Sequence, residues 1–293
     1  MTRGKMNLFG GRSLDFGGTL VMGILNVTRD SFYRESRASG PGDAVSRALR
    51  MAGDGADIID IGAESTRPGS AGVSEEAEME ALIPVVEAVR RELRRMPISA
   101  DTRKASVARA SIDAGADIVN DVSALRLPDE AEGMMETVAS SGAAYILTHT
   151  AGTPDVMQEL ARYSDLLPEL MEFFESSVAR LERAGVERGR IIIDPGLGFG
   201  KSASDNLSIL ANLDVFSKLD LPILIGASRK GFIGTAQGKE ALDSPSERLE
   251  GTLAVSALSV LGGAGIVRVH DVKANRRAVG VALAVKAARV RAA

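Results

Sequence analysis

Residues 56–69 read A-D-I-I-D-I-G-A-E-S-T-R-P-G. The run Ile58-Ile59-Asp60-Ile61 is short and rich in β-branched residues, which is typical of a buried strand. Gly62 interrupts the strand, and a polar loop with Glu64, Ser65, Thr66 and Arg67 follows it. A rigid strand that delivers hydroxyls and a guanidinium into a loop is how α/β proteins build anion sites.

The same pattern recurs along the chain. The segment Asp54-Gly-Ala-Asp-Ile-Ile-Asp60-Ile61 is nearly copied by Ala114-Gly-Ala-Asp-Ile-Val-Asn120-Asp121. In both, a glycine closes a helix, alanine and aspartate enter a strand, and a polar residue stands near its end. Further strands are expected at 19–27, 190–194 and 221–226, at 98–103 where a short strand runs straight into a helix, and within the repeated patterns 141–149 and 263–270. Helices are expected at 42–53, 74–95, 164–185, 205–218 and 272–291.

Eight strand–helix units without a linker or a change of composition define the fold class. They predict an α/β protein, a closed (β/α)8 TIM barrel, with residues 1–293 forming a single domain. Gly-Gly pairs around short apolar segments at 7–18 predict an N-terminal β-hairpin, which we place over the barrel bottom. An open doubly wound sheet is the alternative. That fold needs a glycine-rich turn after the first strand. The sequence there is N-V-T-R-D-S-F, which has no glycine, so the barrel is favoured.

Composition excludes several classes of protein. The chain has no cysteine, so disulfides and cysteine-ligated metals are excluded. Its net charge of −4 provides no basic field, so we expect no nucleic-acid partner. Residues 1–6 have no apolar core of signal-peptide length, and no apolar run of membrane-spanning length is uninterrupted. We therefore expect a cytoplasmic protein with no membrane partner.

Polar residues follow the predicted strands, at the end of the barrel where active sites lie. Each alone could be a helix cap, a turn residue or a solvated charge, but their shared position favours a site. Asp101, Asn120 and Asp194 suit a flat, donor-rich heterocycle. A second group suits phosphate or carboxylate oxygens: Asn26, Thr66, Arg67, Lys230, Arg268 and His270. His149 and Ser228 also stand at strand ends. Phe199 lies in the glycine-rich run Asp194–Lys201, whose glycines we expect to admit a ligand close to the backbone.

Ordered motifs across nearly the whole chain resemble the dihydropteroate synthases, enzymes of the folate pathway. They are M-G-I-L-N-V-T-x-D-S-F, D-I-G-A-E-S-T-R-P-G, I-S-A-D-T, G-A-D-I-V-N-D-V-S, D-P-G-L-G-F-G-K, G-A-S-R-K-G-F-I-G and R-V-H-D-V. The resemblance implies a pterin-binding barrel. By this resemblance, we expect the protein to join 6-hydroxymethyl-7,8-dihydropterin pyrophosphate to p-aminobenzoate, giving 7,8-dihydropteroate and pyrophosphate.

The resemblance also implies roles for individual residues. The pterin ring would be bound by Asp101, Asn120, Asp194 and Lys230. The pyrophosphate and its Mg²⁺ would be held by Arg268, His270 and Asn26, with Asn26 as the metal ligand and Thr66 and Arg67 nearby. The p-aminobenzoate would be framed by Arg67, Pro68, Phe199 and Ser228. We expect Asp101, Asp194, Lys230, Arg268 and His270 to be the catalytic residues.

The sequence departs from the family at a few positions. Arg29 stands where proline is usual, and Glu35 near a usual aspartate, so the first loop is more highly charged. Thr148 and Thr150 replace methionines, which predicts a smaller and more polar pocket wall beside His149. Ala63 replaces a common glycine, with a minor backbone effect expected. The loop from Lys230 to Gly234 has no insertion, so sulfonamides, which mimic p-aminobenzoate, should bind.

Other functions stay open at this point. One is a catalytically silent pterin-binding paralog, and another is a pterin-dependent methyltransferase of the same barrel superfamily. A Schiff-base aldolase is disfavoured because the polar S-R-K turn predicts no lowered pKa for Lys230. A homodimer is the family expectation, with the apolar helices at 253–261 and 278–285 as candidate contact faces.

Overall fold

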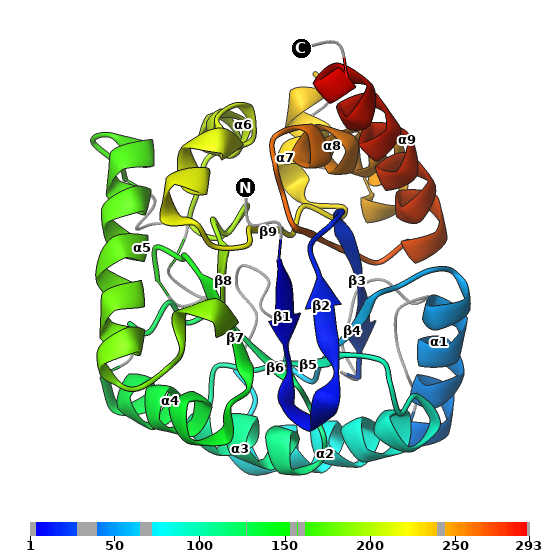
Figure 1. Ribbon diagram of the computed structural model, residues 1–293, viewed down its shortest axis with the longest axis vertical. Helices are drawn as coiled ribbons and strands as arrows, with labels where there is room; N and C mark the ends of the chain where they lie inside the picture. Colours follow the sequence, from blue (N-terminus) through cyan, green and yellow to red (C-terminus); the bar gives the residue numbers. More distant parts are fainter. Residues whose placement is uncertain are drawn as a thin grey trace.

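The protein is an eight-stranded parallel barrel surrounded by helices, in the computed structural model (Figure 1). The structure describes residues 4–27, 40–64, 72–126, 128–152, 157, 162–238 and 244–291. The strand order is β8-β7-β6-β5-β4-β3-β10-β9, and a parallel bridge between Ile193 and Ile223 closes the ring. The strands are β3 (Leu20–Asn26), β4 (Ile58–Gly62), β5 (Ile98–Asp101), β6 (Ile118–Asp121), β7 (Ala144–Thr148), β8 (Ile191–Asp194), β9 (Leu224–Ile225) and β10 (Ile266–Val269). The TIM barrel is confirmed, and the doubly wound alternative is wrong.

Helices follow the strands in sequence and cover the outside of the barrel (Figure 1). They are α1 (Pro41–Gly53), α2 (Glu75–Glu92), α3 (Ala105–Asp113), α4 (Pro128–Ser141), α5 (Leu166–Arg183), α6 (Ala203–Ala211), α7 (Gly231–Ala236), α8 (Leu249–Leu261) and α9 (Val272–Arg291). The prediction of one helix over 205–218 is wrong. Asn212 leaves the helical region at φ −126° and ψ 35°, and a 3₁₀ helix continues over Leu213–Leu219. No helix within the described ranges is long and apolar enough to cross a membrane.

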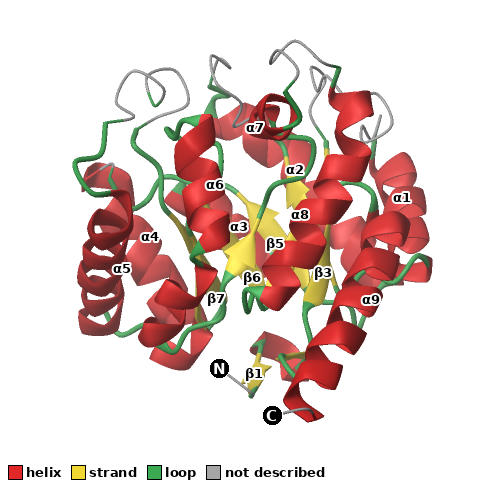
Figure 2. Ribbon diagram, turned by 90° about the horizontal axis from the view of Figure 1, so that it is seen from above, coloured by secondary structure: helices red, strands yellow, loops and turns green. Residues whose placement is uncertain are grey.

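The predicted hairpin lies under the barrel, as expected. Strands β1 (Lys5–Asn7) and β2 (Ser13–Asp15) pair antiparallel. Met6 and Leu14 of these strands, with Leu8 between them, belong to one buried cluster with inward-facing residues of the barrel strands. Figure 2 shows β1 at the end of the barrel opposite α7. The hairpin therefore closes the bottom and leaves the C-terminal strand ends accessible.

The repeated Gly-Ala-Asp segments have a structural explanation. The carboxylate of Asp57 accepts a hydrogen bond from the Val21 backbone N–H at 2.8 Å. That of Asp117 accepts one from the Ile98 N–H at 2.9 Å. Each aspartate also pairs with a helix arginine, Arg276 for Asp57 and Arg90 for Asp117. The aspartate satisfies a backbone donor at the beginning of a neighbouring strand and ties that strand to a helix.

Alternation along the strands decides which side chains reach the barrel mouth. Ile58, Ile118, Ile192 and Ile266 all belong to the buried cluster inside the barrel. Side chains two positions apart on a strand point the same way. The residues two positions further along these strands therefore also point inward, at the C-terminal end: Asp60, Asn120, Asp194 and Arg268. This polar ring in an otherwise apolar barrel is the candidate site.

Candidate active site

Arg268 connects one half of the ring. Its Nε donates to Asp60 Oδ2 at 2.6 Å, and its Nη2 donates to Asp101 Oδ2 at 2.5 Å. Asn120 lies on the other side of Asp60, with its Nδ2 at 3.4 and 3.5 Å from the two carboxylate oxygens. Four strands, β4, β5, β6 and β10, thus bring two carboxylates, an amide and a guanidinium into one cluster.

Burial and mutual charge set the ionisation of this cluster. Burial raises the pKa of Asp101 to about 7; Arg268 opposes the shift, and the Asp60 charge adds to it. Burial alone would lower the pKa of Arg268, but Asp60 and Asp101 outweigh it and raise that pKa above its ordinary value. Arg268 therefore stays charged at every working pH, whereas Asp101 changes its charge near neutrality.

Asp194 and Lys230 form the opposite half of the ring. Asp194 Oδ1 accepts from the Gly196 N–H at 2.8 Å, and burial raises its pKa although Lys230 opposes the shift. Lys230 donates to the Leu197 carbonyl and lies 4.3 Å from the ring centre of Phe199. Burial lowers the pKa of Lys230 to about 8. The expectation that the polar S-R-K turn leaves this pKa unshifted is therefore wrong.

The glycines of the Asp194–Lys201 run make room for protein atoms. At Gly196, whose φ is +69°, a Cβ would lie 1.9 Å from the His149 carbonyl oxygen. At Gly200, it would lie 2.4 Å from Ala151 Cβ. Packing within the protein therefore requires glycine at these two positions, and the close approach of a ligand to the backbone stays a prediction. Phe199 between them is half-buried beside Lys230.

Ser228 and His270 lie together at the ends of β9 and β10. The Ser228 hydroxyl is 2.9 Å from His270 Nδ1 and accepts from the His270 N–H at 3.2 Å. Between the two site residues of the S-R-K turn, Arg229 adopts φ +57° and turns away to pair with Asp271 through two 2.8 Å contacts. The turn therefore presents Ser228 and Lys230 on one side and is fixed by Arg229 on the other.

His149 lies behind the site and takes no part in the ring. Its side chain is 3% exposed, packs edge-on against Phe173 and has Nδ1 2.9 Å from Lys201 Nζ. Burial lowers the pKa of His149 to about 2 and that of Lys201 to about 7. Thr148 and Thr150 are 0% and 2% exposed, and Thr150 donates to the Gly152 carbonyl at 2.7 Å. The expectation of a more polar pocket surface there is wrong, because both hydroxyls are buried.

Some predicted site residues lie outside the described part of the chain. These are Thr66, Arg67 and Pro68, together with the departures at Arg29 and Glu35. Asn26 is described and ends β3, paired in register with Gly62. Glu64 is also described; its carboxylate accepts from the Val73 N–H at 3.3 Å and pairs with Arg103 and Lys104 at the start of α3.

Asp60 and Lys201 are the residues that the sequence reasoning missed. Asp60 lies within the predicted strand at 58–61 and occupies the same position in the repeat as Asn120. That equivalence is a usable signal, because both follow an inward-facing isoleucine by two residues. Lys201 ends the glycine-rich run, and no sequence signal indicates its contact with His149.

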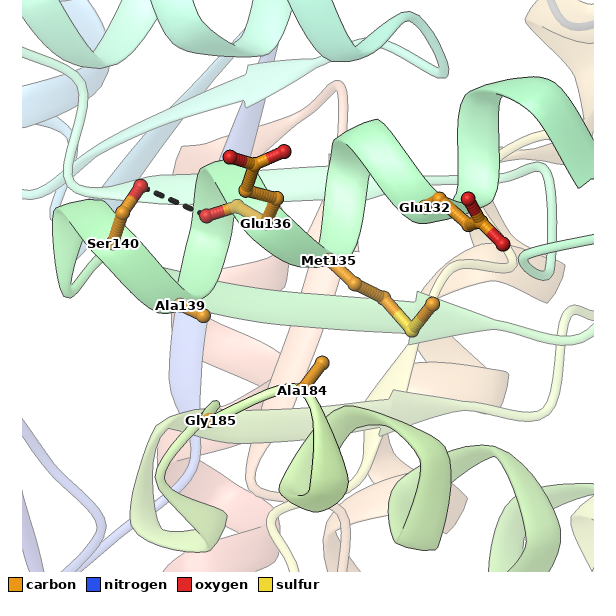
Figure 3. Close-up of a pocket in the computed structure, with 7 residues that line it drawn as sticks. All are labelled: Glu132, Met135, Glu136, Ala139, Ser140, Ala184 and Gly185. Atoms are coloured by element: carbon orange, nitrogen blue, oxygen red, sulfur yellow. Dashed lines mark hydrogen bonds between the residues drawn. The ribbon is translucent and has the colours of Figure 1, made fainter.

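A separate hollow lies on the outer surface between α4 and the end of α5 (Figure 3). Its lining is Glu132, Met135, Glu136, Ala139, Ser140, Ala184 and Gly185. None of these residues belongs to the polar ring, so this hollow is not part of the candidate site.

Comparisons with known proteins agree with the fold. A family model described as pterin binding enzyme matches residues 22–270. The dihydropteroate synthase of Escherichia coli strain K12 is 44% identical over 277 residues, covering 94% of this chain and 95% of that protein. The Bacillus subtilis dihydropteroate synthase is 44% identical over 256 residues, covering 87% and 84%.

Solved structures give the same result. The Yersinia pestis dihydropteroate synthase in a sulfonamide drug complex superposes with a TM-score of 0.90 at 37% identity, covering 97% of this chain and 100% of that one. The Xanthomonas albilineans enzyme with 4-aminobenzoic acid gives 0.87 at 39% identity, covering 97% and 99%. The chain therefore belongs to the pterin-binding enzymes, and within them to the dihydropteroate synthases. It is thus a transferase of the folate pathway.

Proposed function

We propose that the barrel mouth joins 6-hydroxymethyl-7,8-dihydropterin pyrophosphate to p-aminobenzoate, releasing pyrophosphate and 7,8-dihydropteroate. The observation that carries this is the inward ring of Asp60, Asp101, Asn120, Asp194 and Arg268, with Lys230 beside it. A related structure is the Xanthomonas albilineans dihydropteroate synthase in complex with 7,8-dihydropteroate, at 37% identity and a TM-score of 0.83.

The pterin ring is assigned to Asp101, Asn120, Asp194 and Lys230. The carboxylates and the Asn120 amide oxygen accept hydrogen bonds from the ring N–H and amino groups, and the Lys230 ammonium donates to the ring carbonyl and nitrogens. Asp101 is 7% exposed, Asn120 3% and Asp194 5%, so each keeps a small surface toward the mouth. A ligand that covers them replaces little water, which favours tight and oriented binding.

The charges of the site suit loss of pyrophosphate. As that bond breaks, positive charge develops on the pterin methylene and negative charge on the leaving group. The carboxylates of Asp101 and Asp194 stabilise the former, while Arg268 and His270 bind the latter. The amine of p-aminobenzoate is unprotonated at neutral pH, so the attack requires no strong base. Phe199 and Ser228, with Arg67 and Pro68 from the second loop, are assigned to p-aminobenzoate.

Mg²⁺ fits the donors that this chain offers. The described ranges contain no group of three His, Cys, Asp or Glu side chains able to hold a metal. Mg²⁺ in phosphate sites takes one or two protein oxygens and fills its other positions with water and phosphate oxygens. The Asn26 amide oxygen at the end of β3 is such a donor. When bound, the ion would offset charge on the leaving pyrophosphate.

Removing Mg²⁺ with EDTA should abolish pyrophosphate release, and adding Mg²⁺ back should restore it. Asn26→Ala should raise the Mg²⁺ concentration for half-maximal activity by about tenfold, because one inner ligand is replaced by water. Asn212→Ala, at the end of α6 where the amide bonds only helix backbone, is the control and should leave the Mg²⁺ titration unchanged. The same Mg²⁺ concentration for half-maximal activity in Asn26→Ala and the wild type would show that Asn26 is not a Mg²⁺ ligand.

We also propose a homodimer through α8 and α9. Leu258 on α8 is 56% exposed, and Val281 and Val285 on α9 are 67% and 44% exposed, so apolar side chains accumulate on this pair of helices. The two helices pack side by side (Figure 1). A cytoplasmic location and a single domain over residues 1–293 complete the proposal, with support from the cysteine-free and linker-free sequence.

Leu258→Glu combined with Val281→Glu should convert the dimer to monomer, because two carboxylates on each partner would have to be buried. Light scattering coupled to size-exclusion chromatography measures the mass directly. Leu49→Glu on α1, where the leucine is 45% exposed, is the control and should stay dimeric. A dimer that survives the double substitution would place the interface elsewhere.

The reaction itself is tested by pyrophosphate release from pterin pyrophosphate in Mg²⁺ buffer, with and without p-aminobenzoate. Release that depends on p-aminobenzoate and is lost in Lys230→Ala supports the synthase. A sulfonamide should inhibit it competitively with p-aminobenzoate. Pterin binding without release would instead favour the catalytically silent paralog.

A further inference from the structure

Asp60 lies at the centre of the ring and yet is closed to any substrate. Its side chain is 0% exposed, whereas its partner Arg268 keeps 19% of its side chain exposed. Its contacts run to Arg268 at 2.6 Å and to Asn120 at 3.4 and 3.5 Å. A buried carboxylate that touches two groups assigned to substrate binding acts on the substrate only through them.

We propose that Asp60 is a positioning residue for the pterin substrate: it fixes the plane of the Arg268 guanidinium and the orientation of the Asn120 amide. The inference rests on the proposed function, because Arg268 and Asn120 are taken as the groups that meet pterin pyrophosphate. Asp60 would then belong to the site without touching the substrate, because it acts through Arg268 and Asn120.

The effect on Arg268 follows from guanidinium geometry. A guanidinium is planar, and two carboxylates on two of its nitrogens define both its position and its plane. Asp60 holds Nε and Asp101 holds Nη2, from the neighbouring strands β4 and β5. With Asp101 alone, the side chain could swing about one contact and would lose the plane needed to meet an anion. A buried Nε–H would also lose its partner.

The effect on Asn120 follows from the donors available. An ionised carboxylate only accepts hydrogen bonds, so the amide turns its Nδ2 toward Asp60. The Asn120 Oδ1 is then directed away from Asp60, where it accepts from a donor on the ligand. Without the carboxylate the two amide orientations become similar in energy, and part of the enzyme would present N–H groups to the pterin donors.

Asp60 also acts on Asp101 through charge, which gives a readout that packing alone would not move. The charged groups acting on Asp101 are Arg268, which lowers its pKa, and Asp60, Glu78 and Glu64, which raise it. Removing the Asp60 charge therefore lowers the pKa of Asp101 below its value of about 7. If activity requires ionised Asp101, the acid limb of the pH profile should then move to lower pH.

The test compares Asp60→Asn with the wild type and with Ser99→Ala as the matched control. Ser99 is the register partner of Asp60 on β5, is 0% exposed, and its hydroxyl has no hydrogen-bond partner within the described residues. Asp60→Asn should lower kcat/KM for pterin pyrophosphate by roughly 100-fold and leave KM for p-aminobenzoate within about threefold. The acid limb of the pH profile should move to lower pH. Ser99→Ala should change none of these.

Pterin affinity, measured by calorimetry, separates this inference from the proposed function because it needs no turnover. Asp60→Asn should weaken pterin binding by about tenfold. Should Asp60→Asn fail to fold, Asp60→Ser decides in its place. Wild-type kcat/KM and affinity in the folded variant would overturn the inference, as would a loss that Ser99→Ala shares. A wild type that binds pterin but releases no pyrophosphate would contradict the proposed function. The affinity test of Asp60 would remain valid in that case.

Discussion

Arg268→Ala should lower kcat/KM for pterin pyrophosphate by about 1,000-fold or more, since it removes a charged donor to the leaving group. A second loss follows inside the protein. Asp60 and Asp101, 1% and 7% exposed, would remain close together without their shared cation. Since Arg268 is the group that lowers the pKa of Asp101, its removal raises that pKa above about 7. Asp101 would then be protonated at neutral pH, and the carboxylate that stabilises the methylene would be lost.

The pH profile of pyrophosphate release measures both losses. In Arg268→Ala the acid limb should move to higher pH, the direction opposite to that expected for Asp60→Asn. Arg276→Ala removes the arginine that pairs with Asp57 at the other end of the barrel, so it serves as the control. It should leave kcat/KM within about twofold. Arg268→Ala with more than a tenth of wild-type kcat/KM would contradict the assignment of Arg268.

Asp117→Ala should lower the free energy of unfolding by about 3–5 kcal/mol, because it leaves two arginines facing a cavity without their counterion. Asp117 is 0% exposed and accepts from Arg12 and Arg90, each at 2.6 Å, and from the Ile98 N–H at 2.9 Å. Arg12 belongs to the hairpin region and Arg90 to α2, so one carboxylate joins the bottom closure, a helix and β5.

Urea denaturation followed by circular dichroism measures this loss. Arg12→Ala should cost less, about 1 kcal/mol, because Arg90 still neutralises the carboxylate. Glu182→Ala removes an exposed ion pair, in which the Glu182 side chain is 41% exposed and that of Arg188 is 45% exposed. It should lower the free energy of unfolding by under about 0.5 kcal/mol. A loss for Asp117→Ala no greater than that for Glu182→Ala would show that the buried cluster contributes no stability.

The barrel could be predicted from the sequence, and so could the position of several polar residues at its mouth, although not that of Asp60. Gly-Ala-Asp segments mark the strands at 58–62 and 118–121, other short apolar runs mark the remaining strands, and the polar residues that end them include Asp101, Asn120 and Asp194. These signals are local, because a short strand and its terminal residue are read within a few positions. The hairpin was equally local, since Gly-Gly pairs separate its two short strands.

The contacts within the site could not be predicted, because they join distant segments. Arg268 and Asp60 are 208 positions apart, and Arg268 and Asp101 are 167 apart. The shifted pKa of Lys230 depends on its burial under the glycine-rich run. No residue near Lys230 in the sequence indicates that burial. The burial of His149 against Phe173 likewise depends on how α5 packs.

Formation of product at the ring is the measurement that tests the central claim most directly. Wild type and Asp194→Asn would each receive pterin pyrophosphate, Mg²⁺ and p-aminobenzoate carrying a ¹³C-labelled ring, with the product identified by mass spectrometry. The account predicts labelled 7,8-dihydropteroate from the wild type and at least roughly 100-fold less from folded Asp194→Asn, because the inward carboxylate is lost. Undiminished product from Asp194→Asn, or none from folded wild type, would contradict it.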